Sequence, residues 1–491
     1  MSTPTKQPRR LTNKSDQRPS LDLLEPRLAL STSIWTGAGG DGLWSNPSNW
    51  TDNQTPAYGA DVVIDSGNAV VLDQGTPVVG SLALGGRLVV NRDTTLNVDG
   101  PFDLSSNADL RINGLVNWVD GQWATGAGAV VNPGGRLNIG RTSNPAAGSV
   151  AIDTDLVNLG RLAWRGGDLI VNGSLTNATA KMFDAAAPMA MLGEGRFINN
   201  GLFRRGGSAT ATTTIDLDTD NTDRMYVLRG TLALGDTDPD VPSMTNFRGT
   251  LATLAPNAGV ISRAPTIHRD ARFVGRGEFL FTTSTQIFRG DTTFTNATFN
   301  DTASLYVSSA GARFLGDVAL NGNQIVVEGD LVIAGSVELN GATLTGTFDL
   351  LVADVLTLNN AAVDADVQVY SGGALVVSGQ SSVGGNLASA GLISLGTGSL
   401  NIGGSLTTTG ILETSIASSG SGTITATGPA TLGGTLRAVF VGTGFASGGN
   451  YVVVTSSSRT GSFGAFQPLS VPSGLNAGML YTFGAASVQL A

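Results

Sequence analysis

Short alternations of apolar and polar residues, interrupted by glycine-rich turns, run through this chain between about residues 60 and 420. In a recurring unit, Leu stands three residues after the first of two glycines, and Val or Ile follows two residues later. This period of two is typical of a strand with one buried face. Paired glycines suit corners where the backbone takes positive φ. The unit occurs at residues 85–90, 134–139, 166–171 and 372–377, and more loosely at 433–436.

A second regularity is the recurrence of a strand-like triplet that ends in asparagine. Asn117, Asn158 and Asn199 end the triplets Leu-Val-Asn, Leu-Val-Asn and Phe-Ile-Asn, and successive members are 41 residues apart. A fixed spacing of this size indicates stacked units. Two coils of roughly 20 residues would place the three asparagines in line on one side, in alternate layers. Asparagine bonds its neighbours at such corners and tolerates left-handed backbone, so we interpret these three as structural residues.

These patterns predict an all-β chain folded as a right-handed parallel β-helix (solenoid) with an N-terminal cap and a small C-terminal β module. Two-residue Asn-Gly or Asp-Gly hairpin signals are missing at most turns, which disfavours an antiparallel sandwich. Coils of roughly 20–24 residues, each rising roughly 4.8 Å, give about 16 coils, and the handedness follows the preference of parallel crossover connections. We expect a disordered leader at 1–33, a Trp-rich cap at 34–65, β-helix repeats at 66–421 and the C-terminal module at 422–491.

Composition supports the strand assignment and argues against several classes of function. Only 6% of residues are aromatic, and small and β-branched side chains carry most of the apolar content, which favours pleated strands. A net charge of −10, with no Lys or Arg between residues 314 and 436, argues against a nucleic-acid partner. Cys is absent, which excludes thiolate metal sites. No apolar run is long enough for a transmembrane helix.

Residues 24–31 read Leu-Glu-Pro-Arg-Leu-Ala-Leu-Ser and follow a basic, polar leader. The segment resembles the N-terminal LEPR-x-L-L motif of large, repetitive exported proteins of planctomycete-type bacteria. Leu24, Glu25, Pro26 and Arg27 match this sorting motif, and the residues after Arg27 depart from it. The resemblance implies export or sorting, together with a chain built largely of solenoid repeats.

Residues 34–65 combine Trp-Thr-Gly, Trp-Ser-Asn and Asn-Trp with a following Gly-x-Asp and a strand-like run. This segment resembles the opening module of bacterial autotransporter-like and adhesin-like β-helices. Trp35, Trp44 and Trp50 are then expected to cover the first coil, whose backbone and apolar interior would otherwise be open. A sugar-stacking platform is the alternative for these side chains. Residues 422–491 resemble the small C-terminal module that closes many secreted bacterial β-helices.

An enzyme is the rival interpretation, because pectate lyases and polygalacturonases use the same scaffold. Such enzymes need clustered carboxylates and cations that bind the uronate, whereas His268 is the one histidine and Lys181 the one lysine beyond the leader. Residues 262–269 resemble the Arg-x-Pro-x-x-Arg motif of pectate lyases but have one residue too many between Pro265 and Arg269. We therefore predict no catalytic residue, and we expect His268 to lie in an exposed loop.

Acidic residues between Asp216 and Asp223 are the remaining candidate for a ligand site. Asp216, Asp218, Asp220 and Asp223 could supply several of the hard oxygens, about six to eight, that Ca²⁺ takes. The EF-hand pattern is not met, because Asn221 stands at its glycine position. We interpret the segment as a solvated acidic loop and predict no metal or other cofactor, while calcium binding by this loop stays open.

Together these observations predict a secreted or cell-surface, adhesin-like structural β-solenoid without catalytic activity, located outside the cell or in the envelope of a bacterium. Its expected partners are extracellular polysaccharide or envelope proteins, and not nucleic acid. No transmembrane segment is expected. The alternatives are a glycan-binding module and a pectate-lyase-like polysaccharide-degrading enzyme. Exposed aromatic rows along one face would favour the first alternative. A cleft with converging carboxylates and arginine would favour the second.

Overall fold

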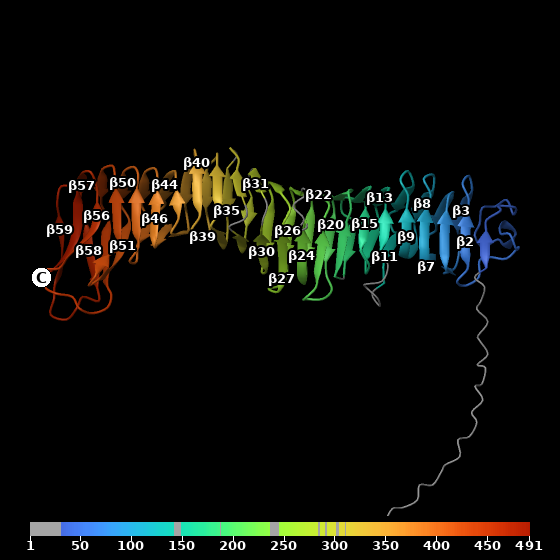
Figure 1. The fold of residues 1–491 in the computed structure, drawn as a ribbon, viewed down its shortest axis with the longest axis horizontal. Coiled ribbons are helices and arrows are strands. Elements are labelled where there is room, and N and C mark those ends of the chain that lie inside the picture. Colours follow the sequence, from blue (N-terminus) through green and yellow to red (C-terminus); the bar gives the residue numbers. More distant parts are fainter. Residues whose placement is uncertain are drawn as a thin grey trace, which may run out of the picture.

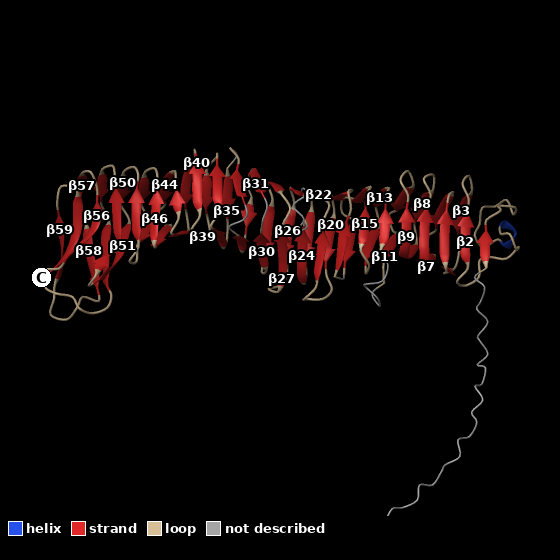
Figure 2. Ribbon diagram, viewed as in Figure 1, coloured by secondary structure: helices blue, strands red, loops and turns tan. Residues whose placement is uncertain are grey.

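In the computed structural model, the described residues are 31–141, 149–186, 188–235, 245–282, 285–289, 292–300, 304–309 and 311–491. They form a parallel β-solenoid of about 18 turns. Figure 1 shows a long rod in which the coils succeed one another in chain order from end to end. Within the described ranges the one helical element is a short 3-10 turn, η1 (Pro47–Asn49), and almost everything else in Figure 2 is strand or connecting loop. The predicted all-β parallel solenoid is confirmed.

Three ladders of parallel strands make up the sides of the rod, and we call them faces 1, 2 and 3. In the first half, face 1 contains β10 (Gly128–Val131), β13 (Asp155–Asn158), β16 (Ser174–Asn177), β19 (Arg196–Asn199) and β22 (Asp218–Asn221), paired in that order. Face 2 contains β11 (Arg136–Ile139), β14 (Arg161–Trp164), β17 (Met182–Ala185), β20 (Leu202–Arg205), β23 (Arg224–Val227), β26 (Thr250–Thr253) and β29 (Arg272–Gly275). Face 3 contains β12 (Val150–Ile152), β15 (Leu169–Val171), β18 (Met189–Leu192) and β21 (Thr212–Ile215).

Alternate residues of each strand point into the rod, as the period of two predicts. The four residues of β11, Arg-Leu-Asn-Ile, alternate between partly exposed and buried, and β13 and β20 follow the same rule. Large aromatics fill the first part of this interior, where Trp118 and Trp123 stack with ring centroids 4.1 Å apart. Farther on, the core contains phenylalanines, with Phe281 and Phe299 stacked at 4.4 Å. One buried cluster runs from the first coil to the last, so no coil has to supply a core of its own.

The two ends of the rod are built differently from its body. At the N-terminal end, β1 (Thr32–Ile34) pairs with β2 (Asp61–Ile64), which places the last residues of the expected leader in a strand. At the C-terminal end, parallel pairing continues beyond residue 421 as far as β58 (Ala465–Leu469), which pairs with β55 (Thr435–Phe440). Antiparallel pairing of β60 (Ala485–Leu490) with β56 (Asn450–Thr455) and β59 (Ala477–Tyr481) then closes this end.

Two further expectations from the sequence concern the sorting motif and transmembrane segments. The sorting motif formed by Leu24, Glu25, Pro26 and Arg27 lies outside the described residues. None of the helical structure that is described has the length and apolar character required to span a bilayer.

Candidate functional site

A ladder of buried asparagine side chains runs inside the rod along the ends of four consecutive face 1 strands. Asn158 donates from Nδ2 to Oδ1 of Asn177 at 2.8 Å, Asn177 donates to Asn199 at 2.7 Å, and Asn199 donates to Asn221 at 2.6 Å. All four side chains are at most 1% exposed. Each of these asparagines also hydrogen-bonds the backbone, and Asn158 donates to the Met182 carbonyl at 3.1 Å and accepts from the Gly160 amide at 3.1 Å. The ladder thereby satisfies backbone groups that would otherwise be buried without partners.

Asn117 belongs to a different ladder from Asn158 and Asn199. Asn158 and Asn199 lie two coils apart on face 1, with Asn177 between them. Asn117 lies in β9 (Leu115–Trp123) on face 2, where it donates to Asn97 and accepts from Asn138, both at 2.6 Å, on the partly exposed outer surface. The expectation that all three asparagines align on one side is therefore wrong for Asn117, because coils differ in length and 41 residues do not always return to the same face.

The outer surface of face 2 holds a row of arginines, which we call the arginine face. Arg136, Arg161, Arg204, Arg224 and Arg272 all project outward from the seven strands between β11 and β29. Arg136 and Arg161 are direct partners in register. Asp184 is the only acidic residue in these seven strands. The result is a positive surface on a chain whose net charge is −10.

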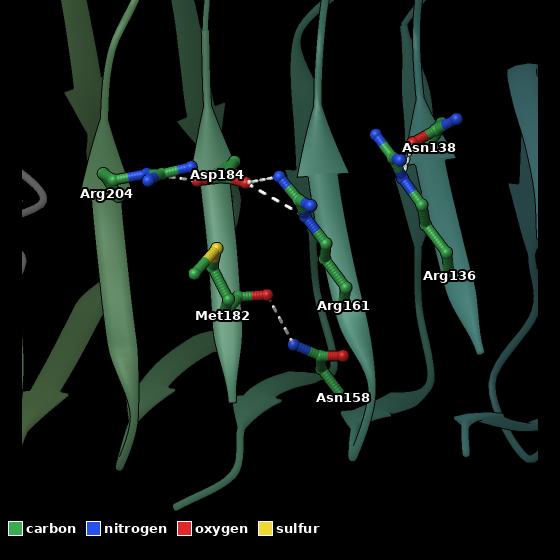
Figure 3. Close-up of polar contacts among 7 residues, drawn as sticks. All are labelled: Arg136, Asn138, Asn158, Arg161, Met182, Asp184 and Arg204. Carbon is green, nitrogen blue, oxygen red and sulfur yellow. Dashed lines mark hydrogen bonds and ion pairs between the residues drawn. The ribbon is translucent and has the colours of Figure 1, made fainter. Parts of the chain in front are cut away.

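Asp184 is shared by two arginines from the coils on either side of it. Arg161 reaches Oδ2 of Asp184 at 2.6 Å and Arg204 reaches Oδ1 at 2.6 Å. Figure 3 shows both guanidinium groups directed at this carboxylate from neighbouring strands, while Arg136 points to Asn138 instead. The Asp184 side chain is only 14% exposed, whereas those of Arg161 and Arg204 are 45% and 35% exposed. One carboxylate therefore neutralises at most one of the two guanidinium charges.

Arg136 and Arg165 add positive charge without a carboxylate of their own among the described residues. Arg136 donates from Nε to Oδ1 of Asn138, a neutral amide. Burial lowers the pKa of Arg136, and the charges of Arg161 and Arg165 lower it further while Asp184 opposes them. Arg165 has a buried Nε with no hydrogen-bond partner in the part of the chain described. Arg165, Asp184 and Arg204 line a groove of about 330 Å³.

A second groove, of about 490 Å³, lies on face 3 toward the middle of the rod. Arg276, Glu278, Asp317 and Glu338 are its charged lining residues, supplied by β30 (Glu278–Phe281), β39 (Ser336–Asn340) and the adjoining turns. Among the residues described, no three His, Cys, Asp or Glu side chains are placed to hold a metal ion. The groove combines carboxylates with one arginine, the arrangement that the enzyme alternative requires.

His268 is buried in the core, and the expectation of an exposed loop is wrong. It lies in β28 (Thr266–Arg269), is 1% exposed, and stacks on Phe288 with ring centroids 4.7 Å apart. Its Nε2 lies 2.9 Å from Oε1 of Gln286, a contact that makes Nε2 the protonated nitrogen of a neutral ring. Burial lowers its pKa to about 4. Because the period of two directs His268 inward while Arg269 points outward, the lyase-like segment does not form one cluster of cations.

The acidic segment from Asp216 to Asp223 contains a strand where a loop was expected. Asp218 and Asp220 belong to β22. Asp220 forms an ion pair with Arg196 at 2.6 Å, and Asp223 forms one with Arg224 at 3.1 Å. These arginines occupy carboxylate oxygens that a calcium ion would need.

The three tryptophans near the N-terminal end form a compact buried group. Trp50 meets Trp35 edge to face at 5.0 Å and Trp44 at 4.8 Å, and its Nε1 donates to the Trp44 carbonyl at 2.9 Å. All three are at most 4% exposed. Their ring faces are therefore not available as a sugar-stacking platform, and their position beside β1 and β2 is the one expected of a cap.

Comparison with known proteins gives limited matches. A G8 domain model matches residues 49–154, the first coils of the rod. No curated protein sequence matches the chain. Among solved structures, the chain is similar to the Haemophilus influenzae Hap adhesin with a TM-score of 0.29 and 11% identity, over 90% of this chain and 65% of that one. The chain therefore spans about 65% of the length of that adhesin.

Sequence reasoning did not identify the arginine face. The sequence does contain a pattern that marks this face, because four of its strands begin with Arg followed by an apolar residue. These pairs are Arg136-Leu137, Arg161-Leu162, Arg224-Met225 and Arg272-Phe273. The strand β19 on face 1 begins in the same way with Arg196-Phe197. Only the register shows which of these arginines are neighbours.

Proposed function

We propose that this protein is a secreted or cell-surface structural rod, adhesin-like in that it holds surface groups at fixed positions outside the cell, and that it has no catalytic role. The observation that carries the proposal is the buried core and strand pairing that continue from β2 to β58. With a rise of ~4.8 Å per coil, about 18 turns span roughly 85 Å. Within the described residues, each inner coil pairs with a coil on either side, which supports a rod that keeps its two ends apart.

The sequence adds support for a location outside the cell. Residues 24–31 resemble a sorting motif of exported bacterial proteins. Internal amide ladders and aromatic stacks stabilise the rod although the chain contains no cysteine for disulfides. A fold stabilised in this way does not depend on the redox state of its surroundings.

The location is tested in the bacterium that makes the protein, with an epitope tag at the C-terminus. We expect protease added to intact cells to degrade the tagged chain, or the chain to be recovered from the medium. The double variant Leu24→Ala/Arg27→Ala is expected to stay inside the cell, and Thr3→Ala/Thr5→Ala serves as a control in the same leader. Recovery of the wild-type chain only from the protected cytoplasmic fraction would contradict the proposal.

A polysaccharide-degrading enzyme is the second candidate, favoured by the groove that contains Arg276, Glu278, Asp317 and Glu338. Purified protein is incubated with pectin, alginate and neutral glucans, with and without Ca²⁺, and new reducing ends and unsaturated products are measured. The structural proposal expects no cleavage of any of them. Cleavage that Glu278→Gln or Glu338→Gln abolishes, and that Glu413→Gln outside the groove leaves intact, would establish the enzyme instead.

A further inference from the structure

We propose that the arginine face and the adjoining Arg165 bind an acidic polysaccharide, with Arg136 and Arg165 as the principal contacts to its carboxylate or sulfate groups. The inference rests on the proposed location outside the cell and specifies a partner for the rod.

Charge is distributed unevenly along the rod. Between β11 and β29, the strands of face 2 present five outward arginines and one aspartate, and Asp223 next to β23 pairs with Arg224. Farther along, the same side of the rod presents Asp349 and Asp366 as direct register partners, and residues 314–436 contain no Lys or Arg. A localised positive patch on an acidic protein attracts anions to one place while the remainder repels them.

In this region, the guanidinium groups of Arg136 and Arg165 pair with no carboxylate of the described residues. Arg136 has an amide as its side-chain partner, and its positive neighbours disfavour its charge. Arg165 lines the groove, and no described residue accepts a hydrogen bond from its buried Nε, which leaves that N–H without the bond that a buried donor normally makes. An anionic group placed between them would accept charge-assisted hydrogen bonds and relieve the repulsion.

The repeat of the fold favours a linear polymer over an isolated anion. Successive coils are ~4.8 Å apart, so the register partners Arg136 and Arg161 repeat along the rod axis at a spacing comparable to one sugar residue of an extended chain. Arg204 lies two coils beyond Arg161 and two residues farther along its strand, in register with Asp184, and widens the positive surface. The groove lined by Arg165, Asp184 and Arg204 offers such a chain a concave surface to contact.

Binding is measured by calorimetry with alginate, polygalacturonate and heparin, and with dextran as a neutral polymer. We expect at least one acidic polymer to bind with an affinity that falls as NaCl is raised, and dextran not to bind. The double variant Arg136→Gln/Arg165→Gln is expected to weaken binding at least tenfold. The control Arg87→Gln/Arg111→Gln removes the same charge from a pair next to Asp109 on face 1 and is expected to change affinity less than twofold.

A second variant tests the same site in the opposite direction. Asp184→Asn removes the only carboxylate of these strands and releases Arg161 and Arg204, so binding should become tighter by several-fold. Equal weakening by the two double variants, no binding of any acidic polymer by the wild type, or duplex DNA binding as tightly would overturn the assignment. So would low-salt self-association that Arg136→Gln/Arg165→Gln abolishes, because a second copy would then occupy the face. None of these outcomes alters the protease test of the proposed location.

Discussion

The side chain of Asn158 donates from Nδ2 to Oδ1 of Asn177 in the next coil, 19 residues later in the chain, at 2.8 Å in the interior of the rod. The same contact repeats between Asn177 and Asn199 and between Asn199 and Asn221, so four coils are joined by amides as well as by backbone pairing. A buried amide row of this kind links neighbouring coils in register, because a shift of one residue would direct each asparagine outward.

Asn158→Ala is expected to lower the free energy of unfolding by about 2 kcal/mol. The variant loses the bonds to Asn177, Met182 and Gly160, and it leaves the buried Oδ1 of Asn177 without this donor. Asn117→Ala is the matched control, because Asn117 occupies a similar ladder on the partly exposed surface where water replaces the lost bonds. Urea unfolding should show that Asn117→Ala lowers the free energy of unfolding by less than about 1 kcal/mol. Equal losses for the two variants would mean that burial of the ladder is unimportant.

Arg204 and Arg205 are adjacent in β20 and offer a comparison of one side chain outside the rod with one inside it. Arg205 is fully buried and donates to the carbonyls of Ser208, Ala211 and Arg229 and, at 3.3 Å, to Thr213 Oγ1. Burial lowers its pKa, and no carboxylate contributes to the shift.

Arg205→Ala should lower the free energy of unfolding by about 3 kcal/mol or more, because it leaves buried carbonyls unpaired and opens a cavity. Arg204→Ala breaks the partly exposed ion pair with Asp184 and should lower the free energy of unfolding by less than about 1 kcal/mol. Chemical denaturation of both variants, followed by circular dichroism, gives the comparison. A loss for Arg204→Ala as large as that for Arg205→Ala would contradict the proposed role of the internal guanidinium.

His268 makes the stability of the rod depend on pH. Its pKa in the folded protein is about 4, below the ordinary value of 6.5, because burial disfavours the charged ring. The unfolded chain therefore binds a proton more readily than the folded one between these values. Stability should fall as pH decreases from about 6.5 toward about 4, by up to about 3 kcal/mol from this residue.

His268→Leu removes the titrating group and should flatten that part of the pH profile. The variant is expected to be less stable than wild type at pH 7, because Gln286 loses a partner. The difference in the free energy of unfolding between wild type and variant should become smaller as pH approaches 4. Denaturant midpoints at pH 7, 5.5 and 4 measure this difference. A gap that stays constant with pH would show that His268 does not contribute this dependence.

Trp50 is expected to hold the first coils closed. Trp50→Ala would remove the edge-to-face contacts with Trp35 and Trp44 and the hydrogen bond to the Trp44 carbonyl, lowering local stability by about 3–5 kcal/mol. Hydrogen exchange should speed up in β2 and β3 (Ala69–Leu72), which lie next to this group, and remain unchanged in β45 (Ala374–Ser378). Trp50→Phe keeps an aromatic ring and should show a smaller effect. Uniform acceleration along the whole rod would contradict a local cap.

Much of the architecture was accessible from local pattern alone. Alternation with a period of two and glycine-marked corners predicted parallel coils, because each strand needs only to bury one face and each corner only to turn. The relation between Asn158 and Asn199 followed from their spacing, which equals two successive coils on face 1. Trp35, Trp44 and Trp50 form a buried group beside the first strands, and their role as a cap stays a prediction.

The tertiary structure alone decided which side chains are neighbours. Coil lengths vary, with 19 residues from Asn158 to Asn177 and 22 from Asn177 to Asn199, so the same 41-residue interval that aligns Asn158 with Asn199 places Asn117 on another face. The burial of His268 depended on the phase of β28 against the core. The pairing of Arg161 and Arg204 with Asp184, and the position of Arg136 beside Arg161, depended on the register of four coils. Alternation is a property of each strand by itself and can be read locally. Charge clusters and buried ladders arise between residues about twenty positions apart, and stacking of the coils is what brings those residues together.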